Sequence, residues 1–414
     1  MRFLEFISLT RILKSTLFTN IHTIKPPKRW FYFYFIIDIS GKYCYNVCVC
    51  IILNMYKVLT KNEVIMKKKF AVIGYGGMGS WHVNHALKSD VLELTGIWDI
   101  DIKKRELAKE RGIYAYGSLE ELLNDKSVEL ITIAIPNDVH LEVVLACLNA
   151  GKNVVCEKPV ALSSSDLEEM IACANKNGKI FTVHQNRRWD VDYLAIQQIV
   201  DGGDIGKPIR IESRIHGSRG IPSDWRGTKA QGGGMILDWG IHLIDQLMLV
   251  YKDEIIDTIN CTITNITNKE VDDGFYLTIT FKSGAVAFIE VGTYNFIALP
   301  RFYMKAEKGT AIIEDWQKKT RVAKCTHWHE SEVIPVQTAA GLTKTMAPRD
   351  SITMDQYEVD IPKSDVHNFY RNIVKAIDGE ATQLVTHDQM RLDMKIMEYA
   401  FKSAELNQTI KFEY

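Results

Sequence analysis

The chain has 414 residues and a formal net charge of −1, with the apolar and charged fractions of an ordinary water-soluble globular protein. Its length exceeds what one hydrophobic core usually organises, so we expect two domains. The near-zero charge provides no basic field, which argues against nucleic acid or an anionic membrane as a partner. Eight scattered cysteines form no dense disulfide framework, so we expect reduced thiols in a cytoplasmic protein.

Residues 1–65 differ from the rest of the chain in composition. A bilayer span needs ~18–20 apolar residues, and the most apolar window, residues 30–55, is interrupted by Asp38 and Lys42. The segment also lacks the ordered regions of a signal peptide. Met66 directly precedes the Lys-Lys-Lys-Phe-Ala-Val-Ile-Gly opening of a typical α/β domain. We interpret residues 1–65 as an extension outside the functional domains; a membrane-attached leader is the alternative.

From Met66 onward, short apolar strands alternate with longer helices. The expected strands are Phe70–Gly74, Leu92–Asp99, Leu130–Ile135, Asn153–Cys156 and Ile180–His184, and the main helices Ser80–Lys88, Lys103–Arg111, Val139–Ala150 and Ser165–Asn177. This alternation is typical of βαβ units in a parallel sheet with helices on both faces. The sequence therefore predicts a doubly wound Rossmann domain over residues 66–187, in a protein of the α/β class.

The pattern changes near residue 190, where longer alternating strands joined by Gly or Asn turns replace the βαβ units. The expected strands are Ile209–His216, Ile256–Ile266, Phe275–Phe281, Ala285–Val291 and Phe302–Glu307, and the helices Val191–Val200, Asp238–Tyr251, Val366–Ile377 and Gln389–Glu405. Alternation with tight turns favours antiparallel pairing. We expect residues 188–414 to form an α+β domain with a large, open, mostly antiparallel sheet that binds substrate and supports oligomerisation.

A glycine motif, Gly74-x-Gly76-x-x-Gly79, separates the first strand from the first helix. In this context the first glycine permits a tight turn and the second lets the backbone approach a pyrophosphate. The third lets the helix pack closely on the strand, so that phosphates meet the helix N-terminus. The motif predicts dinucleotide binding, whereas in isolation it would also suit an ordinary turn.

Asp99 supplies the second half of the dinucleotide fingerprint. It ends the next strand, 20 residues after Gly79, close to the ~20-residue interval expected of an acid that binds ribose. A carboxylate there accepts hydrogen bonds from ribose hydroxyls and repels a 2′-phosphate. NAD is therefore the expected cofactor, and NADP remains possible because Lys103 and Lys104 follow closely.

The run from Ala150 to Pro159 carries a lysine at the end of a predicted strand. The strand ends at Cys156, which places Lys158 at the carboxyl edge of the sheet, where ligands of such sheets bind. Pro159 restricts the backbone of Lys158 to extended angles. An amine aimed at the nicotinamide end is one interpretation, and a solvated surface lysine is the other.

The order of these motifs resembles the Gfo/Idh/MocA family, which includes glucose–fructose oxidoreductase, inositol dehydrogenases and many sugar dehydrogenases. The likeness rests on Gly-Tyr-Gly-Gly-Met-Gly, on Ile135-Pro136-Asn137 with His140, and on Ala-Gly-Lys-Asn-Val-Val-Cys-Glu-Lys-Pro, and it runs from about Lys67 to the C-terminus. It implies that Lys158 lies in the catalytic site and that the Pro-Asn pair contacts NAD. The cofactor-binding candidates are Gly74, Gly76, Gly77, Met78, Gly79, Asp99, Pro136, Asn137, His140, Glu157 and Lys158.

A second constellation follows three glycines at 232–234. Asp238 and His242 are four residues apart, so a helix would place them on one face. A carboxylate and an imidazole so placed can take and relay a hydroxyl proton; a helix cap and a buried structural histidine are the alternatives. The resemblance implies that His242 is the general base, that Asp238 binds substrate and relays the proton, and that Lys158 polarises the reacting oxygen.

Two arginines just beyond the last Rossmann strand are further candidates. Arg187 and Arg188 could hydrogen-bond substrate hydroxyls or hold the junction between the domains, and the sequence does not favour either. Asp272-Asp273 is interpreted as a solvated turn.

We expect no metal site. Cys325, His327, His329 and Glu330 are ligand-type residues, but strand alternation would put the first three on one face at poor angles, without a second cluster.

Together these features predict an NAD(P)-dependent oxidoreductase that transfers a hydride between nicotinamide and a secondary hydroxyl of a sugar, sugar derivative or inositol. The active site should lie between the domains. Relatives imply a homodimer or homotetramer. The alternatives are a glycosidase that uses bound NAD in a transient oxidation, and a regulator that senses a dinucleotide without catalysis.

Overall fold

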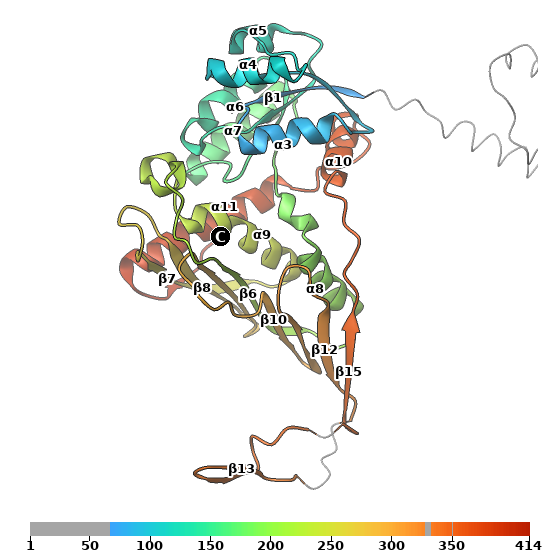
Figure 1. Cartoon of the computed structure of the whole chain (residues 1–414), viewed down its shortest axis with the longest axis vertical. Helices are drawn as coiled ribbons and strands as arrows, with labels where there is room; N and C mark the ends of the chain where they lie inside the picture. The colour runs from blue at the N-terminus through green and yellow to red at the C-terminus, as the bar shows by residue number, and fades with distance from the viewer. Residues whose placement is uncertain (1–66, 328–332, 350) are drawn as a thin grey trace, which may run out of the picture. The chain divides into compact units, whose positions relative to one another are not determined.

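A computed structural model describes residues 67–327, 333–349 and 351–414 (Figure 1). The described residues belong to one compact unit, Met66–Tyr414, and the interpretation of residues 1–65 lies outside the described residues. Within the described ranges, no helix has the length and apolar character needed to cross a membrane.

The first sheet is fully parallel and follows the order β2-β1-β3-β4-β5. Its strands are β1 (Lys68–Ile73), β2 (Leu92–Trp98), β3 (Leu130–Ile133), β4 (Asn153–Cys156) and β5 (Phe181–Val183). Every residue of β3, β4 and β5 is buried, which explains why these strands read as short, nearly continuous apolar runs. The predicted Rossmann-type sheet is confirmed.

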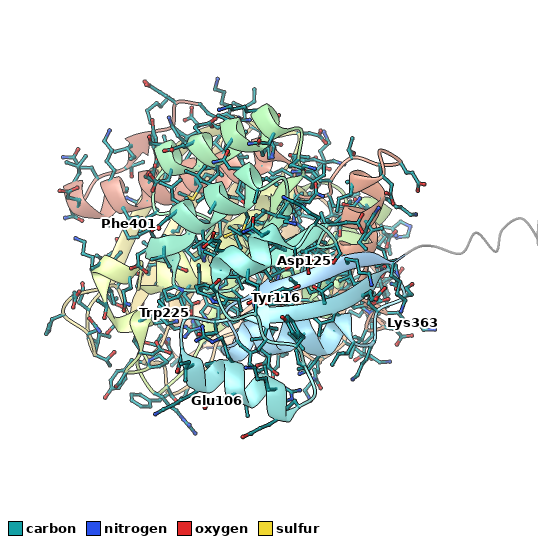
Figure 2. All side chains as sticks on the ribbon, turned by 90° about the horizontal axis from the view of Figure 1, so that it is seen from above. Glu106, Tyr116, Asp125, Trp225, Lys363 and Phe401 are labelled. Carbon is teal, nitrogen blue, oxygen red and sulfur yellow. The ribbon has the colours of Figure 1, made fainter. Side chains whose placement is uncertain are left out.

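Helices connect the strands of this sheet, and polar caps fix where several of them begin. They are α3 (Gly77–Ala86), α4 (Ile102–Glu110), α5 (Leu119–Asn124), α6 (His140–Asn149) and α7 (Ser164–Asn177). The side chains of Asp101, Ser118 and Ser163 accept hydrogen bonds from backbone N–H groups in the first turns of α4, α5 and α7. Tyr116, which precedes α5, donates a hydrogen bond at 2.8 Å to Asp125, the residue directly after α5; Figure 2 labels both residues.

The second sheet has nine strands in the order β15-β12-β11-β10-β6-β9-β8-β7-β16. They are β6 (Pro208–His216), β7 (Ile256–Thr264), β8 (Gly274–Phe281), β9 (Val286–Gly292), β10 (Phe302–Ala306), β11 (Gly309–Ile313), β12 (Thr320–Cys325), β15 (Met354–Val359) and β16 (Ile410–Lys411). Only β6 and β9 pair in parallel; the other pairs are antiparallel. The predicted large, mostly antiparallel sheet is confirmed. A separate hairpin, β13 (Val336–Thr338) and β14 (Gly341–Thr343), follows β12.

Helices cover one face of the nine-stranded sheet, with α9 against β9 and α11 against β7 (Figure 1). The helical elements of this half are η3 (Asn186–Trp189), α8 (Val191–Gly202), η4 (Trp225–Gly227), η5 (Lys229–Gln231), η6 (Ile236–Gly240), α9 (Ile241–Val250), α10 (Asn368–Ile377) and α11 (His387–Leu406). One of them departs from expectation, because η6 is a single π-helical turn that runs directly into α9. Such turns inside helices are frequent at functional sites.

A buried ion pair joins η3 to α9. The Arg188 guanidinium donates to both carboxylate oxygens of Asp245, through Nε at 2.8 Å and through Nη2. Its Nη1 donates to the carbonyl of Leu384 at 2.8 Å. Arg188 and Asp245 are both buried, so each charge depends on the other for compensation.

Replacing Asp245 with alanine should therefore lower the free energy of unfolding by about 3 kcal/mol, because Arg188 keeps its charge without its buried partner. The matched control is Glu168→Ala, which removes the carboxylate partner of Arg391 in a largely exposed pair and should cost less than about 1 kcal/mol. Urea unfolding of the two variants measures both values. Equal losses would show that the Arg188–Asp245 pair carries no special stabilisation.

Candidate functional site

The glycine loop between β1 and α3 is built for close backbone contact. A Cβ atom at Gly74, where φ is +90°, would lie 2.2 Å from the Ala134 carbonyl oxygen, and one at Gly79 would lie 1.9 Å from the Gly74 oxygen. On the outer side, a Cβ at Gly76 or Gly77 would meet no atom within 4 Å. Gly76 caps α3 without any side-chain hydrogen bond, so the first N–H groups of α3 can donate to a phosphate. These residues fit a dinucleotide pyrophosphate.

Asp99 follows β2 and is tied to the same loop. Its Oδ2 accepts a hydrogen bond from the Tyr75 N–H at 2.6 Å, and its Oδ1 accepts one from the Asp101 N–H at 2.8 Å. Each carboxylate oxygen keeps a further lone pair for a ribose hydroxyl. The partly exposed side chain is therefore held in one orientation beside the glycine loop, as the cofactor prediction requires.

The strand-end lysine directly contacts η6, the π-helical turn that contains Asp238. Lys158, two residues after β4, donates from Nζ to the Asp238 Oδ1 and to the Asp238 carbonyl oxygen, each at 2.8 Å. The second oxygen of Asp238 accepts from Arg226 Nε at 3.2 Å. Residues 80 positions apart in the sequence are thus joined at one point, and the amine is not a free surface group.

The electrostatics of this contact keep Asp238 ionised. Burial alone would raise the pKa of its carboxyl group, but the charges and hydrogen bonds of Lys158 and Arg226 outweigh burial and lower that pKa below its ordinary value. The carboxylate therefore carries its negative charge at neutral pH and is available to orient a hydroxyl group or the Lys158 amine.

His242 lies one helical turn after Asp238 and is buried. Its Nδ1 contacts the Oε1 of Gln185 at 3.2 Å; because an amide oxygen can only accept, Nδ1 carries the proton and Nε2 is the basic nitrogen. Burial, together with the nearby charges of Lys158 and Arg187, holds the pKa of His242 well below its usual value. The imidazole is therefore neutral at neutral pH, in the form that accepts a proton.

Hydrogen bonds of Asn137 and His140 hold the predicted Pro136-Asn137 loop in place. Asn137 donates from Nδ2 to the Gly232 carbonyl at 3.1 Å, which links this loop to the three-glycine segment. The buried His140 ring lies 3.1 Å from the carbonyl oxygens of both Pro159 and Ile135. His140 thus connects the Pro136 loop to the Lys158 turn from the inside. Its predicted role in cofactor binding stays a prediction.

The two arginine candidates, Arg187 and Arg188, have different partners in the structure. Arg188 forms the buried ion pair with Asp245. This is the arrangement expected of a residue that holds the junction between the two domains. The Arg187 guanidinium lies 3.9 Å from the centre of the Trp239 ring and pairs with Asp190 at 2.9 Å. Because Trp239 adjoins Asp238, Arg187 lies near the candidate site. Substrate binding by either arginine stays a prediction.

Several residues of this site escaped the sequence analysis. Asp272 and Asp273 are only 4% and 1% exposed, so the interpretation of the pair as a solvated turn is wrong. Asp272 Oδ2 accepts from the Ile236 N–H at 2.8 Å and thereby caps η6. Burial raises the pKa of Asp272 to about 7. Glycine is required at position 234, because the Cβ atom of any other residue there would lie 2.2 Å from Asp272 Oδ1.

Arg226 and Gln185, the partners of Asp238 and His242, also belonged to no recognisable pattern. A signal for Gln185 was its position two residues after β5, the last parallel strand, and two residues before Arg187. Of the discounted metal-type residues, His329 and Glu330 lie outside the described residues, whereas His327 is exposed and Cys325 partly buried.

A parallel sheet with a glycine loop and an acid after its second strand defines a Rossmann-type dinucleotide-binding protein. Residues 68–185 match the family model described as "Oxidoreductase family, NAD-binding Rossmann fold", and residues 193–312 match the GFO/IDH/MocA C-terminal domain. The chain belongs to the Gfo/Idh/MocA oxidoreductase family, as its motifs predicted.

Several relatives resemble the chain over different lengths. It is 28% identical to the scyllo-inositol 2-dehydrogenase (NADP(+)) IolW of Bacillus subtilis, over 84% of this chain and 96% of that protein. It is 32% identical to the inositol 2-dehydrogenase of Salmonella typhimurium, over 38% of this chain and 48% of that protein. Two uncharacterized oxidoreductases of Schizosaccharomyces pombe are 38% and 37% identical over 34% of this chain, and the match spans 38% of each.

Among solved structures, an NAD-binding protein from Listeria innocua is 42% identical. The likeness covers 84% of this chain and 99% of that one, with a TM-score of 0.80.

Asp99→Ala should weaken NAD binding more than NADP binding, because it removes acceptors for the ribose hydroxyls and also the charge that repels a 2′-phosphate. Hydrogen bonds to a charged group contribute about 1.5–3 kcal/mol, so the Kd of NAD should rise at least about tenfold. Isothermal titration with both cofactors measures the change. Asp101→Ala, which removes the α4 cap two residues away, should leave both affinities nearly unchanged. Equal losses for NAD and NADP in Asp99→Ala would remove the ribose assignment.

Proposed function

We propose that the protein is an NAD(P)-dependent dehydrogenase that transfers a hydride between nicotinamide and a secondary hydroxyl of a sugar, sugar derivative or inositol. The observation that carries this proposal is the contact of Lys158 Nζ with Asp238 at 2.8 Å. It joins the carboxyl edge of the Rossmann sheet to the helix that bears a neutral His242. The relatives named for inositol oxidation support the substrate class.

In the proposed reaction the alcohol loses a hydride from carbon and a proton from oxygen, leaving a ketone. The glycine loop and Asp99 would hold NAD, which would supply the hydride acceptor. His242 accepts the hydroxyl proton through Nε2. Lys158 donates a hydrogen bond to the reacting oxygen and stabilises the negative charge that develops there. Asp238 orients Lys158 and a substrate hydroxyl.

The surroundings of the site suit a substrate with several hydroxyl groups. Arg226 and Lys158 supply donors and Asp238 supplies an acceptor. The neighbouring Trp239 is a partly exposed aromatic ring with the Arg187 guanidinium 3.9 Å from its centre. A polyol ring presents hydroxyls at its edge and C–H groups on its faces, so it can use both kinds of contact. We further propose a cytoplasmic homodimer or homotetramer, formed through the nine-stranded sheet.

Lys158→Met and His242→Ala should each lower kcat on the order of 10²–10⁴-fold, the usual contribution of one positioned proton-transfer group. NAD affinity should stay within about threefold of the wild-type value, since neither side chain belongs to the glycine loop or the ribose site. Steady-state kinetics and cofactor titration measure the two effects. The control is Lys176→Met, in the last turn of α7. Unchanged kcat in either variant would exclude that residue from catalysis.

The pH dependence should show no ionisation of His242 near its ordinary value of about 6.5. Its pKa is held well below that value, so the neutral, proton-accepting form persists as pH falls from about 8 to about 6. Profiles of kcat/KM for alcohol oxidation should therefore have the same shape over this range in the wild type and in the residual activity of His242→Asn. An inflection near pH 6.5 that disappears in the variant would contradict this assignment.

A screen of inositols, aldoses and glycosides with NAD and NADP tests the reaction class. A dehydrogenase gives a rising near-ultraviolet absorbance from the reduced cofactor. Glycoside cleavage without net reduction would indicate a glycosidase instead. Cofactor binding with no turnover of any of these compounds would favour a dinucleotide sensor.

A further inference from the structure

Glu157, the residue before Lys158, is the centre of a buried polar cluster. Its Oε1 lies 2.8 Å from His82 Nε2 and 2.8 Å from His184 Nδ1. Its Oε2 accepts from the Lys158 N–H at 3.2 Å. The three side chains come from the turn after β4, from α3 and from the segment after β5, and all are buried. The carboxylate is therefore held between α3 and the turn after β4.

Two further hydroxyl groups extend this cluster and fix where its protons are. Tyr370 of α10 lies 2.7 Å from His82 Nδ1, and Thr132 Oγ1 lies 3.0 Å from the Tyr370 hydroxyl. If Thr132 donates to Tyr370 and Tyr370 donates to His82, then His82 donates through Nε2 to Glu157. Each of these contacts then has one donor and one acceptor.

The protonation states follow from burial. Burial and the neighbouring His184 lower the pKa of His82 to about 4, so the ring is neutral. His184 Nε2 is buried with no hydrogen-bond partner among the described residues; a proton there would be an unsatisfied donor, which favours the singly protonated ring. Burial alone would raise the pKa of Glu157, but its interactions with His184 and His82 hold that pKa well below the usual range.

The cluster therefore carries one uncompensated negative charge. The Lys158 ammonium is directed to Asp238, and within the described part of the chain no lysine or arginine forms an ion pair with Glu157. Neutral N–H donors stabilise the carboxylate without cancelling its charge. Its field reaches the adjoining edge of the sheet, because burial screens it little.

We propose that Glu157 tunes the redox preference of the bound cofactor, because its buried negative charge favours the oxidised nicotinamide ring, which is positive, over the reduced ring, which is neutral. The inference rests on the proposed function, since it requires a nicotinamide at this sheet edge. His82 and His184 are positioning residues that keep the carboxylate ionised, and Tyr370 fixes the tautomer of His82.

A metal ion is the competing explanation for the same three side chains. The possible ligand atoms of His82, Glu157 and His184 all lie within 4.8 Å of one another. However, the hydrogen-bond assignment above gives the facing atoms His82 Nε2, His184 Nδ1 and Glu157 Oε1 their partners without an ion, and the cluster is buried. Elemental analysis of the purified protein is therefore the first measurement. A stoichiometric metal that is lost in Glu157→Gln would overturn the proposal.

The decisive comparison is between Glu157→Gln, which keeps the shape and removes the charge, and Glu157→Asp, which keeps the charge. The Kd values of NAD⁺ and NADH are measured for each by calorimetry or by NADH fluorescence. In Glu157→Gln the ratio of the NAD⁺ Kd to the NADH Kd should rise on the order of tenfold, the effect of two unit charges roughly 12 Å apart at an effective dielectric of ~20. In Glu157→Asp it should change less than about threefold. An unchanged ratio in Glu157→Gln, or equal changes in both variants, would overturn the proposal.

A second variant covers the case in which Glu157→Gln does not fold. His184→Met removes one of the two imidazole donors, so the carboxylate loses part of its stabilisation and the ratio measured at about pH 6 should rise by a smaller factor. The matched control is Tyr193→Phe, which deletes a buried hydroxyl that has no partner among the described residues. Equal ratios in His184→Met, Tyr193→Phe and the wild type would overturn the inference.

Failure of the proposed function would look different from failure of this inference. If the wild-type protein binds neither NAD⁺ nor NADH, the dehydrogenase proposal fails and the redox inference falls with it. If both cofactors bind and sugar oxidation proceeds while the ratio stays fixed in Glu157→Gln, only the redox inference fails.

Discussion

The contact between Lys158 and Asp238 is the constraint on which the candidate site depends. Lys158 belongs to a turn fixed by the parallel sheet, whereas Asp238 belongs to a π-turn held on the other half of the chain. Their 2.8 Å contact gives one location to an amine, a carboxylate and, one turn later, an imidazole. Neither half contains this combination alone, so the candidate site forms only when both halves are folded against each other.

Burial assigns a different charge to each group around this contact. His242 is neutral because its positive form would be desolvated beside Lys158 and Arg187. Asp238 stays ionised because two cations outweigh its desolvation. Glu157 stays ionised because its electrostatic and hydrogen-bond interactions with His184 and His82 outweigh its desolvation. A neutral imidazole and two ionised carboxylates can thus coexist around one contact, because the partners of each group differ in kind.

The sequence predicted the parts of the fold that depend on local pattern. Apolar runs and glycine stops located β1, β3 and β4, and the spacing of Asp99 from the glycine loop placed it beside Tyr75. What depends on distant partners was not predictable. Asp272 caps η6 from 36 positions away, and this contact, rather than helical periodicity, accompanies the π-turn at Asp238. Arg226 and Gln185 likewise gain their importance only from the residues that the fold brings to them.

The return of α10 to the first sheet has a consequence for how the protein is made. Tyr370 reaches Thr132 and His82, and His367 lies 2.6 Å from Ser89, although these contacts span 238 to 288 residues. During synthesis, the nucleotide-binding half therefore emerges from the ribosome long before α10, the helix that completes its interior. Until α10 emerges, buried hydroxyl and imidazole groups around β3 and α3 lack their partners. The polar interior of the first half is thus completed only by side chains from about the last eighth of the chain.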